Sequence, residues 1–165
     1  MSGKLLLEKA KKEGYGVGAF NINNLEMLQA IFDAARECES PIMIQASEGA
    51  IKYAGGEMLY AMVKTMSDKY PHIPVALHLD HGTSVESCLK AIKYGFTSVM
   101  IDASHHSFEE NVHMTKAVCD IARVMGVGVE AELGRLMGIE DNIVVDERDA
   151  VLVNPEEAEK FVQQT

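Results

Sequence analysis

The chain has 165 residues, 47% of them hydrophobic and 24% charged, and its formal net charge at pH 7 is −10. This length and composition predict one globular domain with a substantial core and exclude a disordered chain. No stretch approaches the ~20 apolar residues of a membrane span, and the first residues lack the pattern of a secretory signal. The acidic excess argues against nucleic acid and anionic membranes as partners.

The three cysteines are odd in number, widely spaced and free of any Cys-x-x-Cys pair: Cys38, Cys88 and Cys119. Each falls in a segment with helical spacing, where a free cysteine usually behaves as a small core residue. The sequence therefore predicts a reducing compartment, the cytoplasm, and no cysteine nucleophile.

Short apolar runs alternate with segments of helical spacing along the chain. We expect a first helix over residues 5–13 and then five strands, which start at intervals of roughly 25 to 30 residues, the period of a βα unit. The expected strands are residues 16–20, 41–47, 74–80, 98–104 and 127–133.

The segments between the strands carry helix start and stop signals. Thr83 with Glu86, and Ser107 with Glu110, fit the Ser/Thr-x-x-Glu capping box. Residues 154–157 place an asparagine cap before a proline and two acids. Three glycines follow helical stretches and suit left-handed C-caps: Gly14, Gly95 and Gly126.

This alternation predicts a parallel sheet with helices over its faces. Two architectures are built from such repeats, the doubly wound open sheet and the eight-stranded barrel. A doubly wound nucleotide binder is expected to carry Gly-x-Gly-x-x-Gly after its first strand, whereas residues 21–24 here read Asn-Ile-Asn-Asn. We predict a single α/β domain over residues 1–165 with about five βα units.

Almost every apolar run ends in polar residues. Strand alternation places His78 with Asp80 on one face of the third strand, and Glu130 with Glu132 on one face of the fifth. A buried unpaired carboxylate costs several kcal/mol, on the order of the penalty for an uncompensated ion, and this favours a functional use. Taken singly, each residue also fits a helix cap or a loop ion pair. The polar residues at the strand ends are Asn21, Ser47, Glu48, Asp80, His81, Asp102, Ser104, His105, His106, Glu130 and Glu132.

The residue types indicate metal chemistry. His81 suits a borderline divalent metal such as zinc, and Glu132 suits a second or auxiliary ligand. Asp80, next to the histidine, suits a proton shuttle beside a Lewis-acidic ion. Because a catalytic zinc site takes three protein ligands, the residues alone predict a metal-assisted α/β enzyme with an incomplete ligand set.

Several long segments, in order along the chain, resemble the class II fructose-bisphosphate and tagatose-bisphosphate aldolases. The similarity continues from the first residue to the last. The segments are Gly18-Ala-Phe-Asn-Ile-Asn-Asn24, Val75-Ala-Leu-His-Leu-Asp-His-Gly82, Ser98-Val-Met-Ile-Asp-Ala-Ser-His105, Phe108-Glu-Glu-Asn111 and Val129-Glu-Ala-Glu-Leu-Gly134.

The resemblance implies a TIM (β/α)8 barrel that reversibly cleaves a ketose 1,6-bisphosphate to dihydroxyacetone phosphate and glyceraldehyde 3-phosphate, a step of glycolysis. Fructose 1,6-bisphosphate is favoured over the tagatose isomer. It further implies zinc or another divalent metal, with a monovalent cation as an optional second ion. The resemblance also implies a small sugar phosphate as substrate, a cytoplasmic location and a homo-oligomer.

The resemblance also assigns roles to single residues. It implies that Asp80 is the acid/base at the C4 hydroxyl and that Glu140 is the mobile-loop acid that exchanges a dihydroxyacetone phosphate proton. His81 would ligate zinc, Glu132 would coordinate or approach it, and Asp102 would support the metal pocket.

Two further positions, Asn21 and Ser47, match residues near the substrate and its phosphate. Met137 stands where the family usually has the first glycine of its mobile loop, and its Cβ predicts restricted loop closure. The family's other two histidine ligands and its phosphate loops come from later strands. We therefore expect about five of eight units here and no activity of the chain alone. A noncatalytic half-barrel scaffold and an open doubly wound binder of a phosphorylated metabolite remain alternatives.

Overall fold

The computed structural model describes residues 1–134, 138–140, 143–145 and 152–165, the two short internal segments by their backbone. A parallel sheet forms the body of the protein, and its strands follow the order of the sequence, β1-β2-β3-β4-β5. The strands are β1 (Gly18–Asn21), β2 (Ile42–Ser47), β3 (Val75–Gly82), β4 (Ser98–Ile101) and β5 (Gly128–Ala131).

This strand order decides between the two expected architectures. Right-handed crossovers between sequential neighbours place the successive helices on one face of the sheet, whereas a doubly wound sheet reverses its strand order and carries helices on both faces. The sheet therefore has the order of a (β/α) barrel, and the predicted α/β fold class is confirmed.

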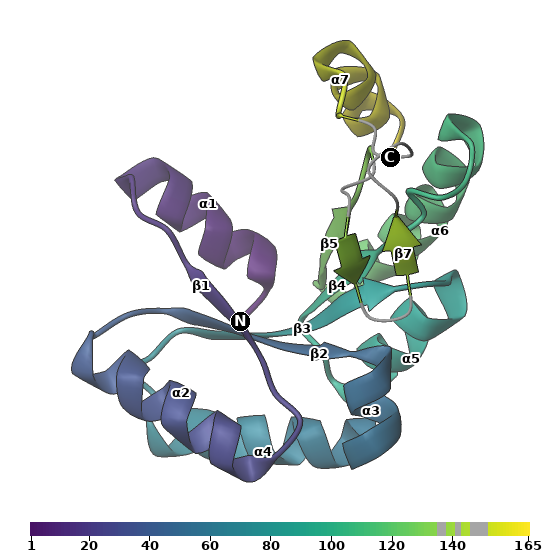
Figure 1. Cartoon of the computed structure of the whole chain (residues 1–165). Helices are drawn as coiled ribbons and strands as arrows, with labels where there is room; N and C mark the ends of the chain where they lie inside the picture. Colours follow the sequence, from purple (N-terminus) through teal and green to yellow (C-terminus); the bar gives the residue numbers. More distant parts are fainter. Residues whose placement is uncertain (135–137, 141–142, 146–151) are drawn as a thin grey trace.

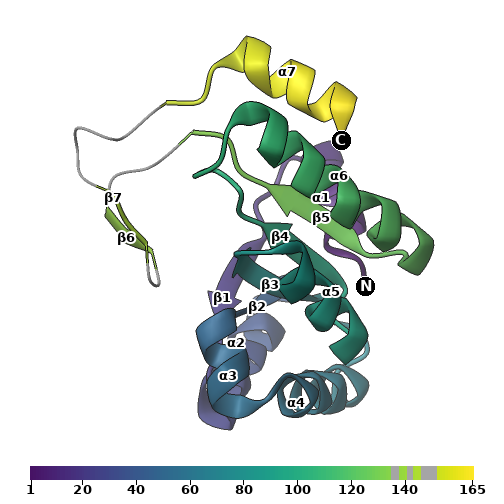
Figure 2. The ribbon, with the colours of Figure 1, turned by 90° about the vertical axis from the view of Figure 1, so that its right-hand side faces the viewer.

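The helices after the strands cover the outer face, as Figures 1 and 2 show for α2, α3, α4 and α5. Helix α7 lies beside α6, where the rings of Phe108 and Phe161 are 6.0 Å apart. The helices are α1 (Gly3–Glu13), α2 (Leu25–Glu37), α3 (Glu48–Ala54), α4 (Gly56–Lys69), α5 (Val85–Tyr94), α6 (Phe108–Met125) and α7 (Pro155–Gln164). The short strands β6 (Gly138–Glu140) and β7 (Ile143–Val145) form a separate antiparallel pair.

The main hydrophobic core lies between the sheet and these outer helices. Alternate residues of the strands, such as Ile44, Leu77 and Val99, are buried there against Phe32 of α2 and Phe96. Each large apolar side chain buried in this way contributes about 1.5–3 kcal/mol relative to its exposed state. The outer face is thus the stabilising face of the sheet.

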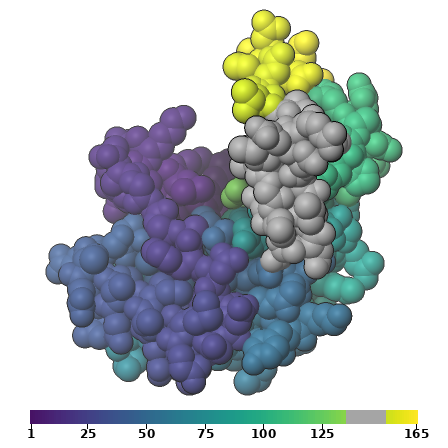
Figure 3. Space-filling view, in the orientation of Figure 1, coloured from purple at the N-terminus to yellow at the C-terminus, as the bar shows by residue number. Residues whose placement is uncertain are grey.

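The inner face is different, because apolar side chains gather mainly at its amino-terminal end. Leu6 of α1 packs there on Met43 and Ala76. Helix α1 approaches the strands closely: a Cβ at Gly3 would lie 2.6 Å from the Oγ of Ser98. Figure 3 shows the purple N-terminal residues and the yellow C-terminal residues apart from each other in the upper part of the molecule. Most side chains in the carboxyl-terminal half of the inner face are polar, with Met100 as an apolar exception.

The five expected strands are all present, and the predicted αL caps at Gly14, Gly95 and Gly126 are confirmed by φ values of 75°, 102° and 69°. Ser107 and Glu110 form the expected capping box of α6. Asn154 caps α7 by accepting from the Glu156 amide.

One predicted cap is wrong. Helix α5 begins one residue later than the Thr83–Glu86 pattern implies, since Ser84 is its N-cap and forms a capping box with Ser87. Thr83 bonds instead to Glu48 of α3. None of the helices in the described part of the chain combines the length and hydropathy of a membrane span.

Candidate metal centre and active site

Asp80 and His81 lie at the carboxyl end of β3, where the pairing of the strand becomes irregular. The register with β2 holds as far as Ser47 opposite Asp80, but the register with β4 shifts between Leu79 and Gly82. His81 has φ of +46°, in the left-handed region that histidine visits more often than most residues. Neighbours on a regular strand point to opposite faces, and this irregularity allows both side chains to reach the inner face.

Two amide side chains hold the carboxylate of Asp80. Asn21 of β1 donates from Nδ2 to Oδ2 over 2.9 Å, and Gln45 of β2 donates from Nε2 to Oδ1 over 2.9 Å. Each carboxylate oxygen therefore has its own donor, one on the adjacent strand β2 and one on β1, the next strand beyond it. This arrangement fixes the plane of the carboxylate beside His81.

His81 is paired with a buried acid, Asp102, which directly follows the next strand, β4. Its Nδ1 lies 2.9 Å from Oδ2 of Asp102, whose other oxygen accepts from the backbone N and the Oγ of Ser104 over 3.1 and 2.7 Å. Burial alone would raise the pKa of the Asp102 carboxyl, but the hydrogen bonds from His81 and Ser104 outweigh it and lower the pKa to about 2. Asp102 is therefore ionised at neutral pH.

Glu132 approaches the same histidine from the end of β5, with Oε2 3.9 Å from Nδ1 of His81. Its backbone is held in place from helix α6: the buried Asn111 donates from Nδ2 to the carbonyl oxygen of Glu132 over 2.8 Å. Thr115 in turn donates to Oδ1 of Asn111 over 3.2 Å. Helix α6 thus holds the backbone of the glutamate at the end of β5.

These three side chains form a group that fits a metal ion. His81, Asp102 and Glu132 each offer one ligand atom, and these atoms all lie within 4.8 Å of one another. An imidazole with two carboxylates is a donor set that suits zinc and other first-row divalent metals. The structure therefore brings together the three residues predicted as metal-binding, with Asp80 directly beside them.

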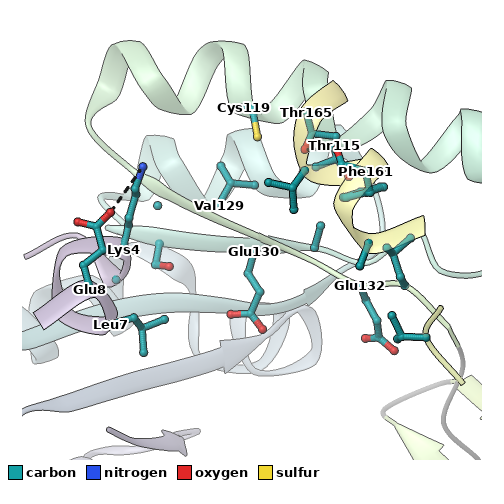
Figure 4. Close-up of a pocket in the computed structure, with 18 of the residues that line it drawn as sticks. Lys4, Leu7, Glu8, Thr115, Cys119, Val129, Glu130, Glu132, Phe161 and Thr165 are labelled. Carbon is teal, nitrogen blue, oxygen red and sulfur yellow. Dashed lines mark hydrogen bonds and ion pairs between the residues drawn. The ribbon is translucent and has the colours of Figure 1, made fainter. Parts of the chain in front are cut away.

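A second histidine lies deeper on the inner face. His78 is fully buried, with Nδ1 2.9 Å from Oγ of Ser98 and Nε2 3.7 Å from Oε2 of Glu130. Burial lowers the pKa of His78 to about 4, so its ring is neutral at pH 7. Figure 4 shows Glu130 and Glu132 on the same side of the β5 segment and Val129 on the other, as strand alternation predicts.

The remaining predicted residues lie at three places. Asn21 contacts Asp80, as described above. Ser47 caps α3 by accepting from the Ala50 amide over 3.3 Å and borders a shallow hollow with Asn23 and Tyr53. The backbone of Glu140 belongs to β6, and its side chain lies outside the described residues, as does Met137.

Sequence reasoning missed Gln45 and Asn111 as site residues. A signal for Gln45 was present, because it is the one amide in the apolar run of β2 and shares the inner face with Ser47. Asn111 lies in a helix, and no local pattern indicates that its side chain reaches the backbone at the end of β5.

The sheet has the strand order of a (β/α) barrel, and its carboxyl end gathers an amide-held carboxylate and a histidine–carboxylate group that could hold a metal ion. The sequence model of the family Fructose-bisphosphate aldolase class-II matches residues 1–165. The chain belongs to this family, whose members are lyases.

Curated relatives and solved structures agree with this assignment. The chain is 68% identical over 165 residues to the fructose-bisphosphate aldolase of Helicobacter pylori and 56% identical to that of Thermus caldophilus. Each match includes 100% of this chain but only 54% and 53% of the respective relative, so the chain spans about half the length of the proteins it matches.

Two crystal structures share the fold. The YdjI aldolase from Escherichia coli matches with a TM-score of 0.84 and 33% identity, over 100% of this chain and 57% of that one. The fructose-bisphosphate aldolase from Campylobacter jejuni matches with a TM-score of 0.66 and 27% identity, over 81% and 46%. The five-stranded sheet thus corresponds to part of a TIM-barrel aldolase.

Proposed function

We propose that this chain provides the acid/base group and part of the metal site for reversible cleavage of fructose 1,6-bisphosphate to dihydroxyacetone phosphate and glyceraldehyde 3-phosphate. The observation that carries the proposal is the position of Asp80 directly before His81, at the strand end where Asp102 and Glu132 also converge. The names of the relatives support fructose bisphosphate as the substrate.

Cleavage of the C3–C4 bond requires that a base remove the proton of the C4 hydroxyl, so that a C4 carbonyl forms while the electron pair of the bond passes toward C3 and C2. Asp80 is suited to this step, because Asn21 and Gln45 fix its carboxylate in one orientation. In the condensation direction, the protonated Asp80 returns the proton to the same oxygen.

The metal group assists at the other end of the bond. A divalent ion held by His81 and Glu132 would act as a Lewis acid toward the substrate ketone. Asp102 bonds to Nδ1 of His81, and this contact sets the ring orientation and raises the basicity of the imidazole. Zinc is the proposed ion because the donor set combines imidazole with carboxylate.

Three further assignments belong to the proposal. Glu140 exchanges the proton at C3, and Asn21 lies beside the C4 hydroxyl through its contact with Asp80. The Ser47 hydroxyl accepts from the Ala50 amide and has a hydrogen to donate to a phosphate or sugar oxygen. The proposal also includes a cytoplasmic homo-oligomer, which the resemblance of the sequence implies; size-exclusion chromatography of the purified protein tests the oligomeric state.

The experiment combines this chain with the part of the Helicobacter pylori enzyme that lies beyond the matched segment, by co-expression. Formation of dihydroxyacetone phosphate is followed with fructose and tagatose bisphosphates in parallel, before and after chelation and zinc addition. We expect turnover of the fructose substrate by the combined protein, its loss on chelation, and none from the chain alone.

The variant that tests the assigned base is Asp80→Asn, which keeps the shape of the side chain. Its turnover is expected to fall by about 10²–10⁴-fold, whereas Asp68→Asn, on the exposed surface of α4, is the matched control. Unchanged turnover in Asp80→Asn refutes the assigned role. An assembled but inactive pair favours the scaffold alternative, and preference for the tagatose isomer reassigns the substrate.

A further inference from the structure

Glu48 connects the start of α3 with the turn that follows His81. It is the first residue of α3, and its Oε1 accepts from the backbone N of Thr83 over 2.8 Å and from the Oγ1 of Thr83 over 3.0 Å. Thr83 lies two residues after the histidine. The contact therefore joins the carboxyl end of β2 to the carboxyl end of β3.

The carboxylate of Glu48 is held in its charged form. Burial alone would raise its pKa, but the hydrogen bonds from Thr83 and Ser87 and the charge of Lys90 together lower the pKa below the usual value. A charged acceptor forms stronger hydrogen bonds than a neutral one. The charged carboxylate of Glu48 therefore forms a strong hydrogen bond with the Thr83 amide.

The anchored turn is a strained one. His81 has φ of +46°, and non-glycine residues keep such a conformation only where the surroundings hold them in it. The backbone N of Asp102 donates to the carbonyl oxygen of Gly82 over 2.8 Å, which holds the turn from β4. Glu48 holds it at the next residue, Thr83, from the opposite side.

Helix capping does not account for the Glu48 contact. Helix α5 has its own N-cap in Ser84, whose Oγ accepts from the Ser87 amide over 3.1 Å, and the Ser87 hydroxyl accepts from the Ser84 amide over 3.2 Å. The start of α5 is therefore satisfied locally. Glu48 also contacts Ser87 of α5, but its bonds to the backbone N and the Oγ1 of Thr83 fall outside the helix and within the turn.

We propose that Glu48 is a positioning residue for His81, which fixes the His81–Thr83 turn so that the imidazole faces Asp102 and Glu132. The inference rests on the proposed metal site. Glu48 itself contacts neither the metal group nor the substrate in this role. Its effect passes through the backbone of the turn.

The test uses the 165-residue chain and two readouts other than turnover. The first is the ring nitrogen chemical shifts of His81 in ¹⁵N-histidine-labelled, metal-free protein, with the signal assigned through His81→Gln. The second is the Co²⁺ dissociation constant from visible absorption. The variants are Glu48→Ala, which removes the acceptor, and Glu48→Gln, which keeps an amide oxygen for Thr83. Glu57→Ala, at an exposed first-turn position of α4, is the control.

We expect Glu48→Ala to shift the His81 signals and weaken Co²⁺ binding about tenfold, at the lower end of the losses seen when the support of a metal ligand is removed. Glu48→Gln is expected to keep the His81 shifts and the Co²⁺ dissociation constant close to those of the wild type. Glu57→Ala is expected to change neither quantity. The proposal is overturned if Glu48→Ala leaves the shifts and the dissociation constant unchanged, or if the control alters them equally.

Failure of the proposed function gives a different result. If the wild-type chain does not bind Co²⁺, the metal assignment fails, and the His81 shifts alone decide the role of Glu48. If circular dichroism shows that Glu48→Ala is unfolded, Thr83→Val takes its place, because it removes one of the two bonds and keeps the backbone N–H. A shift of the His81 signals in Thr83→Val then supports the proposal, and unchanged signals overturn it.

Discussion

The carboxylate of Asp102 lies 2.9 Å from Nδ1 of His81, across the gap between the ends of β4 and β3. Asp102 also donates its backbone amide to the carbonyl oxygen of Gly82 over 2.8 Å. One residue, directly after β4, therefore holds both the ring of the histidine and the turn that contains it. The orientation of His81 depends on the pairing of two strands as well as on its own side-chain rotamer.

Replacement of Asp102 by asparagine removes the charge that supports His81 and keeps the shape of the side chain. We expect Asp102→Asn to weaken Co²⁺ or Zn²⁺ binding by about 10–100-fold, because partners that orient a metal-bound histidine typically contribute this much. Isothermal titration of the metal-free chain measures the effect. Asp120→Asn, in an exposed pair with Lys116 on α6, is the control. Equal affinities in the two variants contradict the prediction.

The buried His78 predicts a pH dependence of stability. The unfolded chain protonates this ring near pH 6.5, whereas burial lowers its pKa to about 4 in the folded protein. Above pH 6.5 both states are neutral and His78 contributes no slope. As the pH falls from 6.5 to 4, the unfolded state binds more protons than the folded state. The free energy of unfolding therefore decreases, by about 3 kcal/mol over this range.

Urea unfolding at several pH values measures this slope. His78→Gln is expected to flatten the change between pH 6.5 and 4, whatever its effect on stability at pH 7. His113→Gln, at an exposed position of α6, is the matched control. The prediction fails if His78→Gln keeps the wild-type slope. Protonation of Asp102 acts at lower pH, because its carboxyl has a pKa of about 2 in the folded protein and 3.8 as its ordinary value.

The sequence predicted those parts of the site that follow from strand geometry. Parallel strands bring their carboxyl ends to one edge, so polar residues at those ends had to meet there, as His81, Asp102 and Glu132 do. The contact of Thr83 with Glu48 was not predictable, because Thr83 also fits a local capping box. The choice between the two patterns depends on tertiary packing.

Gln45 is predicted to support catalysis through Asp80. Gln45→Leu removes the donor to Oδ1 of Asp80 and keeps a side chain of similar size. We expect turnover of the combined enzyme to fall by about tenfold or more, because small displacements of a reacting group reduce rates strongly. The metal dissociation constant is expected to stay at the wild-type value, since Gln45 bonds to the acid/base and not to His81.

Steady-state kinetics with a parallel Co²⁺ titration separates these effects. Gln163→Leu, on α7, is a matched control because it removes the same side-chain amide elsewhere in the chain. A variant of Gln45 with full turnover shows that Asn21 alone orients Asp80. Equal losses of turnover and of metal affinity contradict the separation of the two roles.

Gly82 is predicted to be irreplaceable in the turn after His81. A Cβ at this position would lie 2.7 Å from Cδ2 of Leu79 and 2.7 Å from the carbonyl oxygen of Met100, and the backbone oxygen has little freedom to move. We expect Gly82→Ala to lower the free energy of unfolding by about 1–3 kcal/mol, as overpacking of a core does. Metal affinity is expected to fall as well, because relief of the clash moves the turn.

Gly49→Ala is the control. A Cβ at Gly49 would lie at an ordinary 3.5 Å from Oγ of Ser47. Gly49 also belongs to helix α3, and alanine is favoured over glycine in a helix by about 0.5–1 kcal/mol. Urea unfolding should therefore give effects of opposite sign for the two substitutions, and a Gly82→Ala variant as stable as the wild type contradicts the close packing of the turn.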